Sequence, residues 1–221
     1  PSVGRALEDL VAKHRGDPTA YAVFDFDYTL VLGDSSYVCL WRILEQRDYR
    51  GGNMAERLSE GIPEELKPRV RELFAAEDGG TAVKRFWPLY RHIWNTQGDG
   101  FACAWRSRLF AGYSSPDLAE LARTAMREER KRTGFRPDAN VPSEKRGFVV
   151  IPEVVRLVRD LQSAGIAVYV VSGSRTELLE VATGAEFGFG ISPQRVFGCD
   201  SGVIAGQKTA FIRNRLAPHH G

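Results

Sequence analysis

Two carboxylates two residues apart follow an apolar run near the start of the chain. The run YAVF covers residues 21–24, and Asp25 and Asp27 come after it, followed by Thr29. Alternate residues of an extended chain point the same way, so we expect both carboxylates to project from the end of a buried strand. Two like charges held close are relieved by a cation or a shared proton. Mg²⁺ suits such a pair, because it takes one or two carboxylates and fills its other sites with water and phosphate.

These residue types also fit covalent catalysis. A carboxylate is a competent nucleophile, and a second carboxylate within reach can move a proton to or from the reacting group. A turn is the alternative interpretation, because Asp and Thr side chains also satisfy the backbone of loops. The apolar run before Asp25 favours a site over a turn.

A second polar segment also follows an apolar run. Residues 168–171 read VYVV, Ser172, Gly173 and Ser174 come next, and a helix is predicted over residues 175–182. The free N–H groups at a helix start bind phosphate readily. Ser172 adds a donor, and Gly173 lets the backbone approach a ligand. An ordinary strand-to-helix turn with Ser174 as the helix cap is the alternative.

Lys208 is the third candidate. It follows a predicted hairpin over residues 195–205 and opens a predicted helix that runs to residue 216. The helix macrodipole does not favour a lysine at a helix start, which gives a functional role some weight. A solvated surface position is the alternative, because most lysines lie at the surface.

The segment FDFDYTL resembles the first motif, DxDxT, of the haloacid-dehalogenase-like superfamily, most of whose members are magnesium-dependent phosphatases. The resemblance implies that Asp25 is the nucleophile that accepts the phosphoryl group as an aspartyl-phosphate. It implies that Asp27 is the acid/base that protonates the leaving oxygen and then activates water. Thr29 would steady the site by hydrogen bonding.

The resemblance extends to the other two candidates. Ser172 and the Gly173 amide match the second motif and would bind phosphate, and Lys208 matches the third motif and would offset the charge of phosphate and nucleophile. The implied cofactor is Mg²⁺, held by the Asp25 carboxylate and the Asp27 backbone carbonyl. Family members end in a further strand with a GD-x-x-x-D or DD pair, which this sequence lacks. We therefore expect a sequence shorter than the natural protein, or otherwise impaired magnesium binding.

The elements that must position these residues alternate between helices and strands. A helix is predicted over residues 3–14, and a short apolar run (148–151), a helix (152–164) and a strand (166–171) lead to the second motif. Such alternation is typical of a parallel sheet with helices on both faces. The predicted fold class is α/β, a doubly wound, Rossmann-like parallel sheet core with an inserted all-helical cap domain.

The cap is the segment between the first two motifs. Residues 1–34 and 148–221 are predicted to form the core, and residues 35–147 a helical cap that closes over the phosphate and excludes water. This layout is most similar to the phosphoserine and phosphorylcholine phosphatase branch of the superfamily. Four aromatic residues gather on one predicted cap helix, as core packing or as a cage for a quaternary ammonium group. They are Phe86, Trp87, Tyr90 and Trp94.

Composition limits the other possibilities. The 221 residues are 43% hydrophobic and 26% charged, as in ordinary globular proteins. A net charge of +2 does not favour nucleic acid as a partner, and three widely spaced cysteines form neither a disulfide framework nor a zinc site. No apolar run reaches the length of a membrane span, and no secretory signal is present. The cytoplasm is the expected location, although a signal removed before Pro1 would leave the same sequence.

The combined prediction is a magnesium-dependent phosphatase that hydrolyses a small phosphorylated metabolite through Asp25. A dehalogenase uses the same nucleophile but has no use for an acid at Asp27. A phosphotransferase differs only in its acceptor, and a non-catalytic metabolite-binding protein would fit the lack of the final acidic motif. The expected partner is the small phosphorylated metabolite, without nucleic acid or membrane, and the oligomeric state is not predicted.

Overall fold

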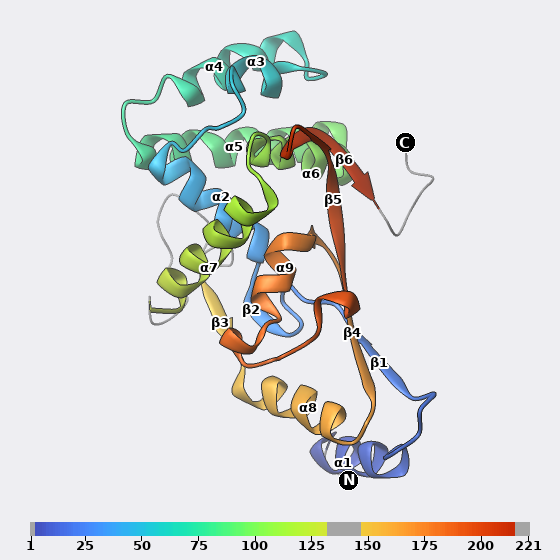
Figure 1. Cartoon of the computed structure of the whole chain (residues 1–221). Coiled ribbons are helices and arrows are strands. Elements are labelled where there is room, and N and C mark those ends of the chain that lie inside the picture. Colours follow the sequence, from blue (N-terminus) through green and yellow to red (C-terminus); the bar gives the residue numbers. More distant parts are fainter. Residues whose placement is uncertain (1–2, 132–146, 215–221) are drawn as a thin grey trace.

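The computed structural model describes residues 3–131 and 147–214, and its main sheet has four strands (Figure 1). The strand order is β1-β4-β5-β6, with β1, β4 and β5 parallel and β6 antiparallel to β5. The strands of this sheet are β1 Tyr21–Phe24, β4 Ala167–Arg175, β5 Val196–Ile204 and β6 Gln207–Asn214. The α/β fold with a Rossmann-like parallel core is therefore confirmed.

The first two strands bring the two polar segments to one edge. Tyr21 pairs with Ala167 and Phe24 with Val170, so β1 and β4 run side by side in the same direction. The carboxyl ends of parallel strands meet at one edge of the sheet, where open α/β sheets bind ligands. Residues that follow β1 and β4 in sequence therefore meet in space.

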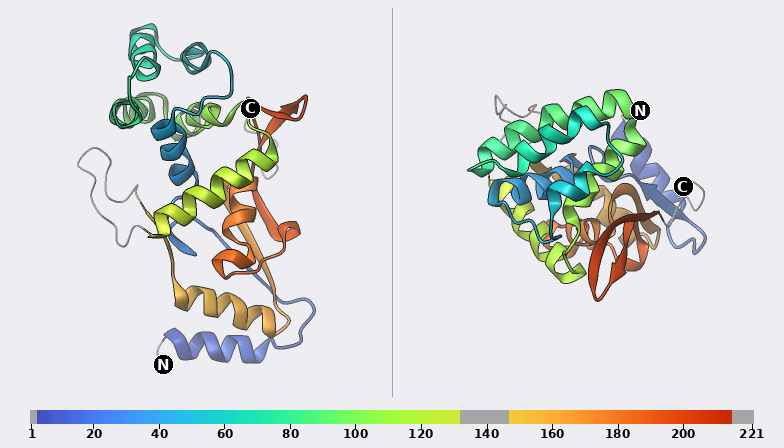
Figure 2. Two further views of the ribbon diagram at one scale, coloured as in Figure 1. Left: turned by 60° about the vertical axis from the view of Figure 1, so that its left-hand side comes forward. Right: turned by 90° about the horizontal axis from the view of Figure 1, so that it is seen from above.

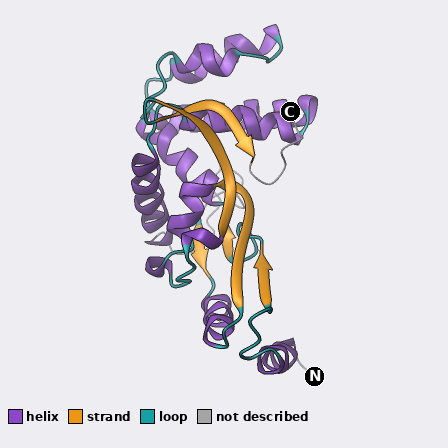
Figure 3. Cartoon of the chain, turned by 45° about the vertical axis from the view of Figure 1, so that its right-hand side comes forward, coloured by secondary structure: helices purple, strands orange, loops and turns teal. Residues whose placement is uncertain are grey.

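Three helices belong to this core. They are α1 Val3–Lys13, α8 Pro152–Ser163 and α9 Thr176–Ala182, each within two residues of its predicted bounds. Val168 and Val170 are fully buried beneath the helices, and Figure 3 shows most helices on one side of the sheet. Among the described residues the other face stays partly open, because the side chains of Tyr21 and Val23 are 70% and 54% exposed.

A second, two-stranded sheet joins the two ends of the helical insertion. In it β2 (Val31–Gly33) runs antiparallel to β3 (Phe148–Val150). Gly33 has a positive φ of 122°, and a Cβ there would collide with the carbonyl oxygen of Gly147. Only glycine therefore lets the entering and leaving strands approach this closely.

The insertion itself is helical, as predicted. Its helices are α2 Ser35–Gln46, α3 Met54–Ser59, α4 Lys67–Phe74, α5 Gly79–Gln97, α6 Asp99–Ser107 and α7 Ser115–Lys131. Short 3₁₀ turns lie at Glu64–Leu66, Arg108–Phe110, Ala185–Phe187 and Pro193–Arg195. Figure 2 shows α3 to α6 gathered at one end of the molecule, while α2 and α7 run back toward the sheet. The division into a core and a separate cap domain at residues 35 and 147 stays a prediction.

Aromatic rings fill the centre of the insertion. Phe86 stacks on Tyr90 with ring centroids 5.7 Å apart and on Trp105 at 5.6 Å. Phe86 and Tyr90 are buried, Trp87 is 9% exposed and Trp94 is 40% exposed. Core packing is thus confirmed for three of the four aromatic residues that the sequence singled out. No described helix is both long and apolar enough to cross a membrane.

The segment around Lys208 differs from its prediction. The predicted helix from Lys208 is wrong, because residues 207–214 form β6 and extend the hairpin with β5. Ala205 and Gly206 both have positive φ values, 49° and 78°. Two positive φ values in a two-residue loop are typical of the hairpin turn whose twist matches its strands. Lys208 therefore lies in a strand and not at a helix start.

The end of β4 also differs. The strand continues through Ser174 to Arg175, with an irregular register against β5 between Val171 and Arg175. The helix α9 starts at Thr176, and Arg175 stands at its cap position without a side-chain cap hydrogen bond. Ser174 is consequently not the helix cap, and its hydroxyl is available to other partners.

Candidate active site

A tight turn after β1 shapes the first part of the site. The amides of Thr29 and Leu30 both donate to the carbonyl of Phe26, at 3.1 and 2.9 Å. Tyr28, with a left-handed φ of 60°, donates its amide to the carbonyl of Gly33 at 3.1 Å. The chain therefore folds back from β1 into β2 and delivers the first turn of α2 to the carboxyl edge of the sheet.

Asp27 is held by residues from both sequence motifs. The Ser35 amide at the start of α2 donates to Asp27 Oδ1 at 2.7 Å. The hydroxyls of Ser174 and Ser172, at the end of β4, donate to Asp27 Oδ2 at 2.5 and 3.4 Å. The hydroxyls of Ser36 and Ser174 lie 2.7 Å apart and extend the same network into α2.

The surroundings of Asp27 make it titrate near neutral pH. Burial raises the pKa of its carboxyl, and the negative charge of Asp34 raises it further. Hydrogen bonds from Ser174 and Ser35 act in the opposite direction, and the resulting pKa is about 6. A carboxyl with such a pKa can both donate and accept a proton near neutral pH, as a general acid/base must.

Asp25 has a different environment. It is exposed, and its Oδ2 accepts a 2.9 Å hydrogen bond from the Thr29 hydroxyl. Among the described residues its other oxygen, Oδ1, has no hydrogen-bond partner. The structure thus brings Thr29 to Asp25 and Ser172 to Asp27, while the two aspartates share no hydrogen-bond partner.

Gly173 lies exposed at the same edge. A Cβ built on it would meet no atom within 4 Å, so packing against the described residues does not require a glycine at this position. A glycine inside a strand often marks a place where a ligand or another backbone approaches closely. Its neighbour Ser172 is buried and accepts the Ser174 amide at 3.2 Å.

Lys208 is not joined to these residues by any contact among the described part of the chain. Its buried ammonium group forms an ion pair with Glu177, which also accepts the Ser115 hydroxyl at 3.2 Å. Burial raises the pKa of Glu177, but the hydrogen bond from Lys208, a backbone hydrogen bond and the charges of Arg175 and Lys208 together outweigh burial and hold that pKa below its ordinary value. Glu177 therefore stays ionised, and Lys208 neutralises a buried carboxylate.

Sequence reasoning missed two contributors. The first is Ser36, which lies at the start of a helix and was not singled out as a site residue. The run Asp34-Ser35-Ser36 is nevertheless a polar signal before an apolar helix. Arg106 comes from α6 and lies over the ring of Tyr37, with 4.4 Å between its guanidinium carbon and the ring centroid. No local pattern marks Arg106, because its position depends on how α6 packs on α5 and how α5 packs on α2.

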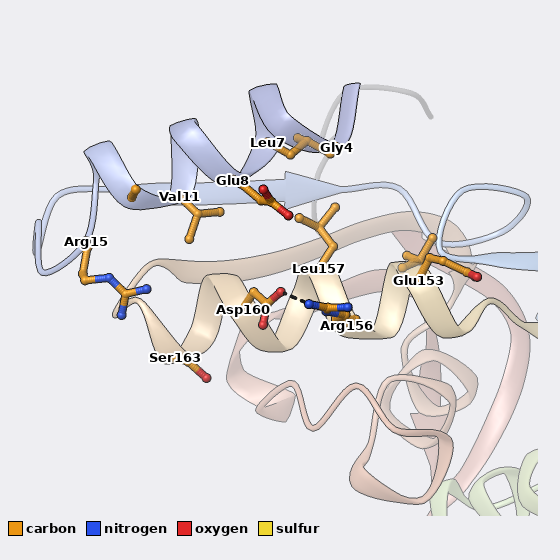
Figure 4. Close-up of a pocket in the computed structure, with 12 residues that line it drawn as sticks. Gly4, Leu7, Glu8, Val11, Arg15, Glu153, Arg156, Leu157, Asp160 and Ser163 are labelled. Atoms are coloured by element: carbon orange, nitrogen blue, oxygen red, sulfur yellow. Dashed lines mark ion pairs between the residues drawn. The ribbon is translucent and has the colours of Figure 1, made fainter. Parts of the chain in front are cut away.

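A separate hollow lies between α1 and α8 (Figure 4). It measures about 600 Å³ and is lined by apolar side chains, including Leu7, Val11 and Leu157. Arg156 and Asp160 form an ion pair at its rim. Because α1 and α8 lead into the starts of β1 and β4, this hollow lies at the opposite end of the sheet from Asp27.

Comparisons with known proteins place these observations in context. Residues 22–220 match a family model described as haloacid dehalogenase-like hydrolase. A solved structure of a conserved, functionally unknown protein from Anaerococcus prevotii is similar over 96% of this chain and 71% of that one, with 18% identity and a TM-score of 0.73. At this identity the likeness shows the fold alone. No protein of curated function matches the sequence.

Two further structures are similar with TM-scores below 0.5. One is a protein of unknown function from Bordetella pertussis, with 20% identity, a TM-score of 0.49, and coverage of 87% of this chain and 66% of that one. The other is a phosphoserine phosphohydrolase-like protein from Francisella tularensis, with 15% identity, a TM-score of 0.44, and coverage of 89% and 66%. The chain thus spans about two thirds of the length of these structures.

Proposed function

Because this chain belongs to the haloacid dehalogenase-like hydrolase family, we propose that it is a magnesium-dependent phosphatase that acts on a small phosphorylated metabolite through Asp25. The observation that carries the proposal is the contact of Asp27 with Ser172 and Ser174. It joins the DxDxT turn after β1 to the serine segment of β4, at the edge where such sheets bind ligands.

The proposed reaction has two steps. A carboxylate oxygen of Asp25 attacks phosphorus, the bond from phosphorus to the leaving oxygen breaks, and Asp27 gives its proton to that oxygen. Water then attacks the phosphorus of the aspartyl-phosphate while Asp27 takes up a proton from the water, which releases phosphate and restores the Asp25 carboxylate. The exposure of Asp25 and the pKa of about 6 of Asp27 support these roles.

Neighbouring groups would orient the reactants. The Thr29 hydroxyl donates to Asp25 Oδ2, which leaves Oδ1 to face the phosphorus. Ser172 makes only a 3.4 Å contact with Asp27, so its hydroxyl can turn to a phosphate oxygen at little cost. The Gly173 amide is the second proposed phosphate donor. In this way the chain positions the phosphoryl group before the reaction begins, which lowers the barrier.

The residues at this edge fit a magnesium site in which phosphate and water supply most of the ligands. Among the described residues, no cluster of three or more His, Cys, Asp or Glu side chains forms a metal cage. Mg²⁺ needs only one or two carboxylates when substrate and water supply the other oxygens. We propose the Asp25 carboxylate and the Asp27 backbone carbonyl as its protein ligands. Bound there, Mg²⁺ would stabilise the negative charge of the transferring phosphoryl group.

A phosphate contact of Lys208 remains a prediction. It would require the buried ion pair with Glu177 to open. The same pair holds the first turn of α9, which directly follows the strand that carries Ser172. Lys208 can therefore support the site by fixing the position of this strand end without touching the phosphate.

The test is hydrolysis of a generic aryl phosphate, measured with and without Mg²⁺, by the parent chain and its Asp25→Asn variant. We expect magnesium-dependent turnover that Asp25→Asn abolishes. Asp9→Asn is the matched control, because Asp9 is exposed on α1 and its loss removes the same charge. Turnover that survives in Asp25→Asn would reject Asp25 as the nucleophile.

A further inference from the structure

A second cavity lies next to the hollow between α1 and α8. It measures about 510 Å³, a size typical of small-molecule sites. Residues from the end of α7, from β3, from α8 and from the 3₁₀ turn at Ala185–Phe187 line it. None of these residues belongs to the candidate active site. The cavity is therefore a separate place for a ligand.

Three arginines from two helices line this cavity. Arg130 comes from the last turn of α7, and Arg156 and Arg159 come from α8. All three are exposed, so a ligand can reach them from solvent. Two carboxylates, Asp160 and Glu186, line the cavity as well. A cleft lined by one sign of charge concentrates ions of the opposite sign, so the balance between these groups decides what the cavity attracts.

The two carboxylates do not balance the arginines. Glu186 forms ion pairs with Arg127 and, at 3.4 Å, with Arg123, and neither of these arginines lines the cavity. Asp160 forms an ion pair with Arg156, with 3.7 Å between its Oδ2 and the arginine Nε. Both carboxylates are thus paired. Among the described residues, the other two arginines that line the cavity have no carboxylate partner.

These two arginines also keep unused hydrogen-bond donors. The Arg159 Nε donates to the Gly188 carbonyl at 2.8 Å. Gly188 has a left-handed φ of 98°, and a Cβ there would lie 3.2 Å from Val155 Cγ1, so the glycine lets this turn lie close to α8. Among the described residues, the two terminal nitrogens of Arg159 have no hydrogen-bond partner, and the guanidinium group of Arg130 has none at all.

We propose that this cavity binds a small anion with two or more linked charged groups, such as a diphosphate. Phosphate and carboxylate groups match the planar fork of an arginine, because each can accept two parallel hydrogen bonds. Two forks from different helices suit two linked groups better than one. The bound anion would contact Arg130 on α7, the last helix of the insertion, and Arg159 on α8 of the core. It would thereby tie the insertion to the core and stabilise the folded chain.

The test is titration calorimetry with inorganic pyrophosphate and with inorganic phosphate, at matched ionic strength and without Mg²⁺. We expect the parent to bind pyrophosphate about tenfold more tightly than phosphate, as a second charged contact provides. Arg130→Gln and Arg159→Gln should each weaken pyrophosphate binding about tenfold. Arg130→Lys should give an intermediate affinity, because lysine keeps the charge but lacks the fork. Citrate, titrated in parallel, tells whether linked phosphates or linked carboxylates bind more tightly.

Two variants serve as controls. Arg91→Gln removes the same charge from an exposed position of α5 that does not line the cavity, so pyrophosphate affinity should stay at the parent value. Ser172→Ala tests the candidate active site as the place of binding and should also leave the affinity unchanged. No binding by the parent, equal affinities for phosphate and pyrophosphate, or an affinity that neither cavity variant changes would overturn the proposal.

Thermal unfolding gives a second measure that does not depend on turnover, so this proposal can fail or succeed independently of the phosphatase proposal. Pyrophosphate should raise the Tm of the parent with increasing concentration and raise that of Arg130→Gln much less. A variant that had lost its fold would show no cooperative transition even without ligand. An equal rise in the parent and in Arg130→Gln would indicate a general salt effect and reject the site.

Discussion

The Ser174 hydroxyl donates a 2.5 Å hydrogen bond to Asp27 across 147 positions of sequence. This contact fastens the turn after β1 to the end of β4, and the 2.7 Å contact between Ser174 and Ser36 adds the start of α2. Three segments that carry the site are therefore held by one side chain. The sequence marked Ser174 only as a possible helix cap. Because β4 continues through Arg175, Ser174 lies in the strand and its hydroxyl contacts Asp27 instead.

Replacement of Ser174 should destabilise the fold through this network. Ser174→Ala leaves the buried hydroxyl of Ser36 and the Asp27 carboxylate each short of a partner, at a cost of about 1–3 kcal/mol. Urea unfolding measures the change in free energy. Ser163→Ala, at an exposed position of α8, should change it by less than about 0.5 kcal/mol. Equal effects of the two variants would show that the network contributes little.

The raised pKa of Asp27 should make the stability of the fold decrease as the pH rises. Burial first, and then the charge of Asp34, raise its pKa from 3.8 to about 6 in the folded chain, so the folded state holds this proton more tightly than the unfolded state. The contribution of Asp27 to stability is then greatest below about pH 4 and is lost as the pH rises through 6.

Asp27→Asn removes this titration. The free energy of unfolding of the variant minus that of the parent should therefore increase from about pH 4 to pH 6 and level off above pH 7. Urea unfolding in buffers with a chelator measures it without bound metal. A difference that stays constant or falls over this range would contradict the raised pKa.

Lys208 should matter for stability. Lys208→Met leaves the buried Glu177 with only the longer, 4.0 Å ion pair to Arg175. Breaking a buried pair costs about 3–5 kcal/mol when no other partner remains, so we expect a loss at or below the lower end of this range. The double variant Lys208→Met/Glu177→Gln should recover part of this loss. Activity distinguishes the two possible roles of Lys208. If Lys208 contacts phosphate in the parent, the refolded double variant should be inactive. If Lys208 only supports the strand end, turnover should return in the double variant.

Thr29 should affect catalysis more than stability. Thr29→Val removes the hydroxyl that donates to Asp25 at an exposed position, so we expect a change in unfolding free energy of less than about 0.5 kcal/mol. The loss of a hydrogen bond to the proposed nucleophile should lower kcat/KM about tenfold or more. Steady-state kinetics with an aryl phosphate, beside a urea melt, separates the two effects. An unchanged kcat/KM would remove Thr29 from the site.

Local patterns in the sequence predicted the parts of the fold that local physics decides. The apolar run before Asp25 predicted β1, and Pro152 at the first helical turn marked the start of α8. The helix predicted at Lys208 was wrong because Ala205 adopts the left-handed φ of a hairpin turn, a role usually taken by Asn, Asp or Gly. Of the two turn residues only Gly206 has such a type, so the sequence predicted a hairpin over residues 195–205 but did not place its turn at Ala205 and Gly206.

Contacts between distant segments were beyond local reasoning. Arg106 and Tyr37 are far apart in sequence and meet only because α6 packs on α5, which in turn packs on α2. Lys208 and Glu177 pair because β6 extends the sheet beside α9. Family resemblance singled out Asp25, Asp27 and Ser172 as candidates by type and spacing, but the partners that set the pKa of Asp27 depend on the tertiary structure.

The position of β1 at the end of the strand order affects how this chain should behave in solution. β1 pairs only with β4 among the described strands, and its outward side chains Tyr21 and Val23 are largely exposed. An open apolar strand edge is a template for other chains, so light scattering should reveal reversible clusters that grow with protein concentration. Val23→Lys should suppress them, since charge on an edge strand opposes pairing between molecules.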